Sequence, residues 1–242
     1  MTAAEAHLPF APYSGRVWRL IEGQYRPATN KIVDILREQQ VLEEALEATK
    51  PPIPPECAHL DYRLSAPFRY GIYPGNSRFR RPGRSPGVYY AAERSLTAAL
   101  ETAWWSAVRF FRASPDTKLP DQALDRSAIE AAVAAPIALD LMEPAMAGAG
   151  PWMDPTSYEA CQQLADRARQ SGCEAIRYAS ARDPDEGANL ALLSCRAFER
   201  SAPVGEESWH IFLKPDRVQL FNETGRAQYE YRLEETALGH AV

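Results

Sequence analysis

Apolar residues recur along the chain with two different spacings, and these spacings predict its helices and strands. A spacing of three to four residues over 31–48, 94–112 and 157–171 predicts a helix in each of these ranges. The proline run at 51–55 ends the first helix, and Gly172 closes the third. Alternating or short continuous apolar runs predict strands over 16–21, 136–141, 190–198, 208–214, 217–221 and 228–233. A further strand is expected to begin at about residue 175.

The order of these elements predicts an α+β fold. A further short helix is expected at about 127–135, directly before the strand at 136–141. The later strands are separated by gaps of hairpin length, which favours antiparallel pairing over a doubly wound parallel sheet. We expect one or two small twisted sheets flanked by a few helices. Residues 1–60 would form a first strand, a helical extension and a proline-rich hinge, and residues 61–242 the main domain.

The helix expected over 31–48 has an apolar face, and Asn30 is placed to cap its start. The residues of this face are Ile32, Ile35, Leu36, Leu42 and Leu46. Amphipathic helices usually pack their apolar face on the core of their own fold, and we expect this helix to do so. The alternative is a lid or an arm that binds a partner.

Composition identifies an ordinary globular protein. The chain has 242 residues, of which 45% are hydrophobic and 24% charged, so a disordered chain is excluded. Lys and Arg number 27 against 32 Asp and Glu, which gives a formal net charge of -5. This acidity argues against a general nucleic-acid-binding protein. No apolar run approaches the roughly 20 residues that span a bilayer.

The cysteines and the first residues bear on the compartment. Cys57, Cys161, Cys173 and Cys195 are scattered without a close pair, which predicts reduced thiols rather than a disulfide framework or a zinc site. The first ten residues lack the basic and apolar regions of a secretory signal. We therefore expect a cytoplasmic protein, with no metal ligands in any recognisable spacing.

One stretch, residues 62–92, contains no Asp or Glu but six arginines and five tyrosines. The guanidinium group binds phosphate or carboxylate through two parallel hydrogen bonds, and aromatic rings offer flat faces on which a heterocycle stacks. The stretch is therefore either a nucleotide site without a glycine fingerprint or a set of structural ion pairs. The arginines are Arg63, Arg69, Arg78, Arg80, Arg81 and Arg84.

A carboxylate follows this stretch on the next helix. Helix carboxylates are usually solvated, but Glu101 has Leu100 and Trp104 within one turn and few charged neighbours. These surroundings favour a half-buried side chain with a polar partner. An arginine and a tyrosine of this stretch and the Glu101 carboxylate would then lie close together, where a strand leads into the helix.

A second polar group occurs in the segment IRYASARDPDEGANLALL. Ser180 lies between Arg177 and Arg182, and Asn189 comes just before the next strand. No GxSxG elbow surrounds Ser180, and no histidine is placed to act as its base. We therefore interpret Ser180 as a hydroxyl that positions a ligand, not as a nucleophile. His210, in SWHIFLK, is interpreted as an ordinary sheet residue.

The two segments NSRFRRPGRSPGVYYAAERSLTAALE and IRYASARDPDEGANLA together resemble the two signatures of the RES-domain family of bacterial toxins. The family is named for its Arg, Glu and Ser. The resemblance implies a fold akin to the diphtheria-toxin-like ADP-ribosyltransferases, with NAD as substrate and no metal. It also implies that Arg78 contacts the NAD phosphate, Tyr90 stacks on nicotinamide, Glu101 is the catalytic carboxylate and Ser180 supports the site.

This sequence departs from the family pattern in the first segment. Arg80 stands where the family has Asn, and the loop that leads to Tyr90 is two residues longer. Arg80 is therefore an alternative to Arg78 as phosphate ligand, and Tyr89 an alternative to Tyr90. The expected NAD-binding residues are Arg69, Arg78, Arg80, Tyr89, Tyr90, Ser180 and Asn189.

The resemblance implies the toxin of a toxin–antitoxin pair that cleaves the nicotinamide–ribose bond and transfers ADP-ribose to a protein. One alternative is an enzyme that degrades NAD by transfer to water or phosphate. Another is a nucleic-acid-binding or RNA-cleaving toxin that uses the arginine stretch. The expected partners are a protein substrate and an antitoxin with a helix-turn-helix part, with neither membrane nor direct nucleic-acid binding.

Overall fold

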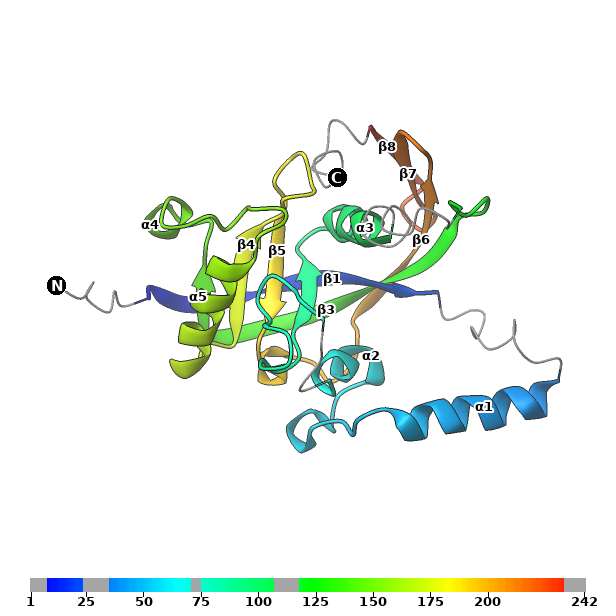
Figure 1. The fold of residues 1–242 in the computed structure, drawn as a ribbon, viewed down its shortest axis with the longest axis horizontal. Coiled ribbons are helices and arrows are strands. Elements are labelled where there is room, and N and C mark those ends of the chain that lie inside the picture. Colours follow the sequence, from blue (N-terminus) through cyan, green and yellow to red (C-terminus); the bar gives the residue numbers. More distant parts are fainter. Residues whose placement is uncertain (1–7, 24–34, 71–74, 107–117, 233–242) are drawn as a thin grey trace.

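The computed structural model describes residues 8–23, 35–70, 75–106 and 118–232. Its centre is an eight-stranded sheet in the order β1-β2-β5-β4-β3-β6-β7-β8, in which β1 also pairs with β3 (Figure 1). The strands are β1 (Phe10–Glu22), β2 (Tyr89–Ala92), β3 (Leu124–Asp140), β4 (Ala175–Ala179), β5 (Ala188–Leu192), β6 (Gly205–Leu213), β7 (Arg217–Asn222) and β8 (Ala227–Arg232).

The long strand β3 organises this sheet. It pairs with β1 along one edge, and on the other edge with β6 through its first half and with β4 through its last residues. Strands β1, β2, β5, β4 and β3 thus close on themselves, while β6, β7 and β8 extend outward from β3. All pairings are antiparallel except β3 with β4. The mixed, sheet-dominated α/β fold agrees with the predicted antiparallel character.

The helix predicted at 127–135 is wrong, because these residues lie inside β3. The alanine-rich sequence has a high intrinsic helix propensity, but pairing with β1 on one edge and β6 on the other overrides it. Ile129, Ala131, Val133 and Ala135 alternate into one core cluster. Alanines on the opposite face hide this alternation in the sequence.

The remaining strands appear near their predicted positions. The predicted strand over 190–198 is shorter, since β5 ends at Leu192 and Cys195–Ala197 form a 3₁₀ turn. The first strand is longer than predicted and lies within the sheet. The described helices are α1 (Leu36–Thr49), α2 (Tyr62–Ser65), α3 (Ser95–Trp104), α4 (Pro144–Ala147) and α5 (Glu159–Gln170).

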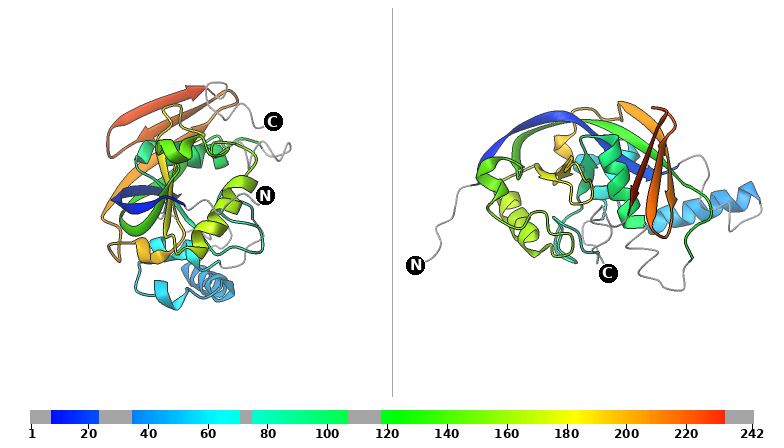
Figure 2. Two further views of the ribbon diagram at one scale, coloured as in Figure 1. Left: turned by 90° about the vertical axis from the view of Figure 1, so that its left-hand side faces the viewer. Right: turned by 90° about the horizontal axis from the view of Figure 1, so that it is seen from above.

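Helices α3 and α5 pack on the sheet (Figures 1 and 2), and α3 carries the end of the first polar segment. Leu100 and Trp104 of α3 share a core cluster with Trp209 of β6. Cys161 and Leu164 of α5 share another with β4. Chain reversal after α5 uses Gly172 at φ 76°, as predicted. Two residues assigned to the stripe of α3, at 107 and 111, lie outside the described residues, as do Asn30 and Ile32 before α1.

Helix α1 does not pack its apolar face on the core, so that expectation is wrong. Gln39 is the buried residue of α1, whereas Leu36, Val41 and Leu46 are exposed. Polar contacts attach α1 to the body at its C-terminal end, where Glu47 pairs with Arg69. Gln39 lies within the predicted apolar face, between Ile35 and Leu42, but the leucines Leu36 and Leu46 of that face stay exposed.

The prediction of four reduced cysteines is also wrong, because Cys57 and Cys195 form a disulfide. They are separated by 138 residues in the sequence, and the 3₁₀ turns Pro55–Cys57 and Cys195–Ala197 bring them together in the core. Cys161 and Cys173 are free and buried. Burial raises the pKa of the Cys173 thiol to about 11. No helix within the described ranges is both long and apolar enough to cross a membrane.

Candidate functional site

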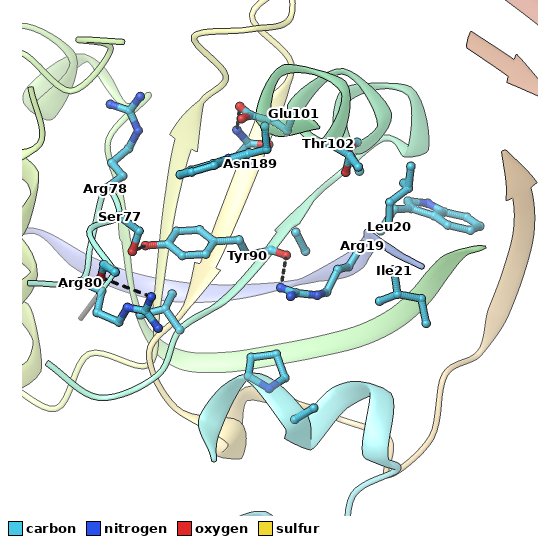
Figure 3. Close-up of a pocket in the computed structure, with 18 of the residues that line it drawn as sticks. Arg19, Leu20, Ile21, Ser77, Arg78, Arg80, Tyr90, Glu101, Thr102 and Asn189 are labelled. Atoms are coloured by element: carbon cyan, nitrogen blue, oxygen red, sulfur yellow. Dashed lines mark hydrogen bonds between the residues drawn. The ribbon is translucent and has the colours of Figure 1, made fainter. Parts of the chain in front are cut away.

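A cavity of about 770 Å³ lies beside α3, between the 75–80 loop and the end of β1 (Figure 3). Residues of both polar segments line it. Arg78 and Arg80 lie at one end, Arg19 lies at the other, and the ring of Tyr90 lies between them. Glu101 and Asn189 lie together at one side of the cavity.

The Glu101 carboxylate is fixed by two donors. The Ser180 hydroxyl donates to its Oε1 at 2.7 Å, and the Asn189 amide donates to the same oxygen at 2.8 Å. Ser180 Oγ also accepts from the backbone amides of Arg182 and Asp183, both at 3.1 Å. Because these amides occupy the acceptor side of the hydroxyl, its proton is directed at Glu101.

Ser180 contacts Glu101 but does not reach the cavity surface. It is completely buried and is not part of the cavity lining. Asn189, in contrast, lines the cavity and touches Glu101. The predicted supporting hydroxyl thus lies behind the carboxylate, seen from the cavity.

The turn after Ser180 is held on the first turn of α3. The buried Asp183 carboxylate accepts from Thr97 Oγ1 at 2.6 Å and from Arg94 Nη2 at 2.8 Å. A side chain at Gly187 would collide with Thr97 and Asp183, so the turn requires glycine there. These contacts fix the two polar segments relative to each other, and they therefore fix Ser180 relative to Glu101.

Neighbouring tyrosines of β2 point to opposite faces, as strand geometry requires. Tyr90 lines the cavity, and its hydroxyl lies 2.9 Å from Ser77 Oγ and accepts from the Phe79 amide at 3.0 Å. Burial raises the pKa of Tyr90. Tyr89 is completely buried in the core, edge-on to Phe198, and lies outside the lining.

Arg78 and Arg80 project from the tight 77–80 turn, which helix α5 supports. Gln162 of α5 donates to the carbonyl oxygens of Ser77 at 3.0 Å and Arg80 at 3.1 Å. Arg78 donates to the Trp152 carbonyl and lies 5.0 Å from the ring centre of Tyr158. Among the described residues no carboxylate forms an ion pair with Arg78.

Three other arginines of the 62–92 stretch have carboxylate partners instead. Arg63 pairs with Asp61 and Glu206, Arg69 with Glu47 and Arg81 with Asp166. Arg69 is buried and lies outside the cavity lining, so the structure does not bring it to the other predicted site residues. Structural ion pairs therefore account for three of the six arginines of the stretch.

Two arginines of the cavity were not singled out from the sequence. Arg19 of β1 donates to the Tyr90 carbonyl at 3.1 Å, and its guanidinium lies 4.9 Å from the ring centre of Tyr89. Burial lowers the pKa of Arg19. Arg182 lies 4.0 Å from the ring centre of Trp104. An arginine within the apolar run VWRLI was the available signal for Arg19, because charged side chains are rarely buried without a partner.

The site combines one oriented carboxylate with guanidinium groups and an aromatic ring. Such a set can bind a phosphate-containing ligand and face a developing positive charge with the carboxylate. Among the described residues no group of three or more His, Cys, Asp or Glu side chains could hold a metal ion.

Comparisons with known proteins give a matching family and a similar solved structure. The family model described as RES domain matches residues 53–213, which include both polar segments. No curated protein matches the chain. A chain in the crystal structure of the M. tuberculosis MbcT–MbcA toxin–antitoxin complex aligns at 14% identity with a TM-score of 0.45, covering 82% of this chain and 86% of that one.

Proposed function

Because the chain belongs to the RES domain family, we propose that it is the toxin of a bacterial toxin–antitoxin pair, that it binds NAD in the cavity and that it cleaves the nicotinamide–ribose bond. ADP-ribose is then transferred to a protein. The observation that carries this proposal is the Glu101 carboxylate, which Ser180 and Asn189 hold in the cavity that Arg78 and Tyr90 also line.

The cavity suits a dinucleotide in size and in chemistry. Its volume of about 770 Å³ lies in the range of sites that enclose small ligands. Arg78, with no carboxylate partner in the described part of the chain, supplies a fork that matches the diphosphate, and Arg80 adds charge beside it. The Tyr90 ring offers a face for the nicotinamide.

The proposed reaction needs a carboxylate that is held in place before the bond breaks. As the C1′–N bond breaks, its electron pair stays on the nicotinamide nitrogen and positive charge develops on the ribose. Glu101 stabilises that charge, and the acceptor then bonds to C1′ and loses its proton. Ser180 and Asn189 fix the orientation of the carboxylate, so little reorganisation is needed in the transition state.

The remaining parts of the proposal come from the sequence. From the family resemblance, the cognate antitoxin carries a helix-turn-helix part; from the chain itself, the pair acts in the cytoplasm and residues 61–242 form the catalytic domain after a 1–60 extension. The nature of the acceptor separates the transferase from an NAD-degrading enzyme, and one measurement distinguishes them.

The test is incubation of the protein with NAD labelled in its adenylate part, together with a cell lysate. Label on a discrete protein band supports the transferase. Free ADP-ribose or its phosphate, without labelled protein, would mean that the enzyme degrades NAD instead of transferring ADP-ribose to a protein. No loss of NAD in any condition contradicts the proposal.

The Glu101→Gln variant connects this activity to the site. Glutamine keeps the shape of the side chain and removes its charge, so turnover should fall about 100- to 1,000-fold with little change in NAD affinity. Glu130→Gln is the matched control, since Glu130 is a half-buried carboxylate of β3 outside the cavity lining. Normal turnover by a folded Glu101→Gln variant would contradict the assignment.

A further inference from the structure

Arg182 is a second buried arginine of the cavity that has no carboxylate partner. It is 3% exposed and lines the cavity together with Arg78, which is 7% exposed. Within the described ranges, no carboxylate forms an ion pair with either guanidinium group. A buried charge is costly unless an opposite charge meets it, so two such arginines at one cavity indicate an anionic ligand.

The loop that leads into α5 holds both guanidinium groups. Arg78 donates to the Trp152 carbonyl, and Arg182 donates through Nη2 to the Pro155 carbonyl at 2.9 Å. Tyr158 contacts both groups, since its ring centre lies 5.0 Å from the Arg78 guanidinium and its hydroxyl accepts from Arg182 Nη2 at 3.2 Å. Carbonyl oxygens and aromatic rings orient a guanidinium group without neutralising it. The loop therefore places two charged forks around one tyrosine.

The Arg182 side chain also keeps a donor for a ligand. Its guanidinium lies 4.0 Å from the ring centre of Trp104, and this contact limits where the group can point. Nε is enclosed by the fold, and both hydrogen bonds of the side chain use Nη2. Nη1 has no partner among the described residues and is not enclosed, so it can donate to a group in the cavity.

Arg182 is connected to Glu101 through Ser180. The backbone amide of Arg182 donates to Ser180 Oγ at 3.1 Å, and the Ser180 hydroxyl donates to Glu101 at 2.7 Å. In the proposed reaction Glu101 acts on the ribose whose C5′ carries the diphosphate, so the diphosphate must bind near Glu101. Arg182 therefore lies in the part of the cavity where phosphate groups are expected.

The arginines of the cavity differ in where they lie relative to this carboxylate. In the view of Figure 3, Arg78 and Glu101 lie above the Tyr90 ring, and Arg80 lies below it. Among the described residues that line the cavity, Glu101 carries the one carboxylate. Arg78 is thus on the side of Glu101, and Arg182 joins it there through their shared contact with Tyr158.

We propose that Arg182 binds the NAD diphosphate together with Arg78, with one guanidinium group for each phosphate. This inference rests on the proposed function, because it names a further residue that binds the same substrate. Each phosphate of the diphosphate carries one negative charge, so two planar forks match it in charge and in the number of acceptor oxygens. The pair selects a ligand with two linked phosphate groups over a ligand with one or none.

Calorimetry with two ligands that lack the scissile bond tests this assignment on the full-length protein. ADP-ribose carries the diphosphate, whereas adenosine carries no phosphate. Arg182→Gln removes one charged fork, so it should lower the affinity for ADP-ribose about 10- to 100-fold and change the affinity for adenosine less than about twofold. A residue that only supports the shape of the cavity would change both affinities alike.

A second variant and a matched control complete the series. Arg182→Lys keeps the alkyl stem and the charge but cannot make two parallel hydrogen bonds, so the affinity for ADP-ribose should still fall at least about fivefold. Arg63→Gln is the control, since Arg63 lines the cavity but pairs with Asp61 and Glu206, and it should cost less than about threefold. Circular dichroism and urea unfolding identify the folded variants, and Arg182→Lys serves as the test if Arg182→Gln does not fold.

The unmodified protein provides a measurement that needs no variant. ADP-ribose should bind at least about tenfold more tightly than adenosine monophosphate, because its second phosphate meets the second guanidinium group. Arg182→Gln should remove most of this preference. An unmodified protein that binds both ligands equally would contradict the paired site.

Two further outcomes would overturn the assignment. Equal losses for ADP-ribose and adenosine in Arg182→Gln would make Arg182 a structural residue of the cavity. Unchanged ADP-ribose affinity in that variant, with a severe loss in Arg80→Gln, would assign the second phosphate to Arg80. NAD turnover by the unmodified protein is measured separately. Absence of turnover with the expected ADP-ribose results would contradict the proposed reaction and leave the anion-binding role of Arg182 in place.

Discussion

Four of the six arginines of residues 62–92 fall into two groups that the sequence cannot distinguish. Arg63, Arg69 and Arg81 have carboxylate partners, and Arg69 is buried in that contact. Arg78 is also buried, but its contacts are a carbonyl oxygen and aromatic rings, and it lines the cavity. A guanidinium group without a carboxylate can recognise an anion from outside, whereas a paired group stabilises the fold.

The difference originates in residues outside the stretch. The carboxylates that neutralise the first group belong to Asp61, directly before the stretch, and to Glu47 of α1, Asp166 of α5 and Glu206 of β6. The turn that carries Arg78 is instead held by Gln162, a neutral donor, and no carboxylate in the described part of the chain forms an ion pair with Arg78. The function of each arginine therefore depends on which side chain the fold places opposite it.

Replacement of Arg78 should have the largest effect among these arginines. If Arg78 makes a bidentate contact with the NAD diphosphate, Arg78→Ala should cost about 2 to 3 kcal/mol, or roughly 30- to 150-fold in NAD affinity. Arg78→Lys should restore little, because a point charge cannot reproduce the planar fork. The measurement is NAD affinity by calorimetry for the four alanine variants at positions 78, 80, 81 and 84.

The same four alanine variants distinguish a specific contact with the NAD phosphate from a general electrostatic attraction. Arg81→Ala and Arg84→Ala should each cost below about 1 kcal/mol in NAD affinity, and their effect should vanish in high salt. A severe loss in Arg80→Ala with a mild one in Arg78→Ala would reassign the phosphate contact to Arg80. Both arginines line the cavity, so the outcome depends on the pose of the ligand.

Replacement of Arg69 should have the opposite profile. Arg69→Ala removes the ion pair with Glu47 and the bond to the Pro51 carbonyl, so the free energy of unfolding should fall by about 1 kcal/mol. NAD affinity should stay within about twofold, because Arg69 lies outside the cavity lining. Urea unfolding and calorimetry on one preparation measure both quantities. A tenfold loss of NAD affinity in a stable Arg69→Ala variant would mean that Arg69 belongs to the NAD-binding site.

The sequence predicted the strands and helices more successfully than their environment. Most strands and helices lie near their predicted positions, because periodicity records which residues face a core. The alanine-rich part of β3 was misassigned, since alanine fits both a helix and a sheet with two buried faces. The face of α1 and the Cys57–Cys195 disulfide depend on contacts between distant segments, which periodicity does not encode.

For the candidate site, the sequence selected candidate residues but not their arrangement. Two segments were selected from their residues and from a family resemblance, and the structure brings Glu101 into contact with Ser180 and Asn189. The choice between Tyr89 and Tyr90 required the register of β2 against β5, which decides the face of each side chain. Arg19 was missed because β1 is distant in sequence and reaches the cavity only through pairing with β2 and β3.

The smallest expected effect concerns His210, a paired cation outside the cavity. Hydrogen bonds from the ring to Asp125 at 2.8 Å and Glu223 at 3.3 Å raise the pKa of His210. A raised pKa in the folded state means that the stabilisation is fully present below the unfolded pKa of about 6.5. It is lost as the pH rises through the folded pKa.

Because the side chain is 35% exposed, this stabilisation should stay below about 0.5 kcal/mol. Urea unfolding between pH 5 and pH 9 should show a small fall in stability with rising pH, and His210→Gln should remove that part of the fall. NAD affinity should be the same in both proteins, since His210 belongs with the paired cations that stabilise the fold. A pH-dependent change in NAD affinity that disappears in His210→Gln would show that a paired cation far from the cavity also affects the ligand, and would weaken the division between the two groups.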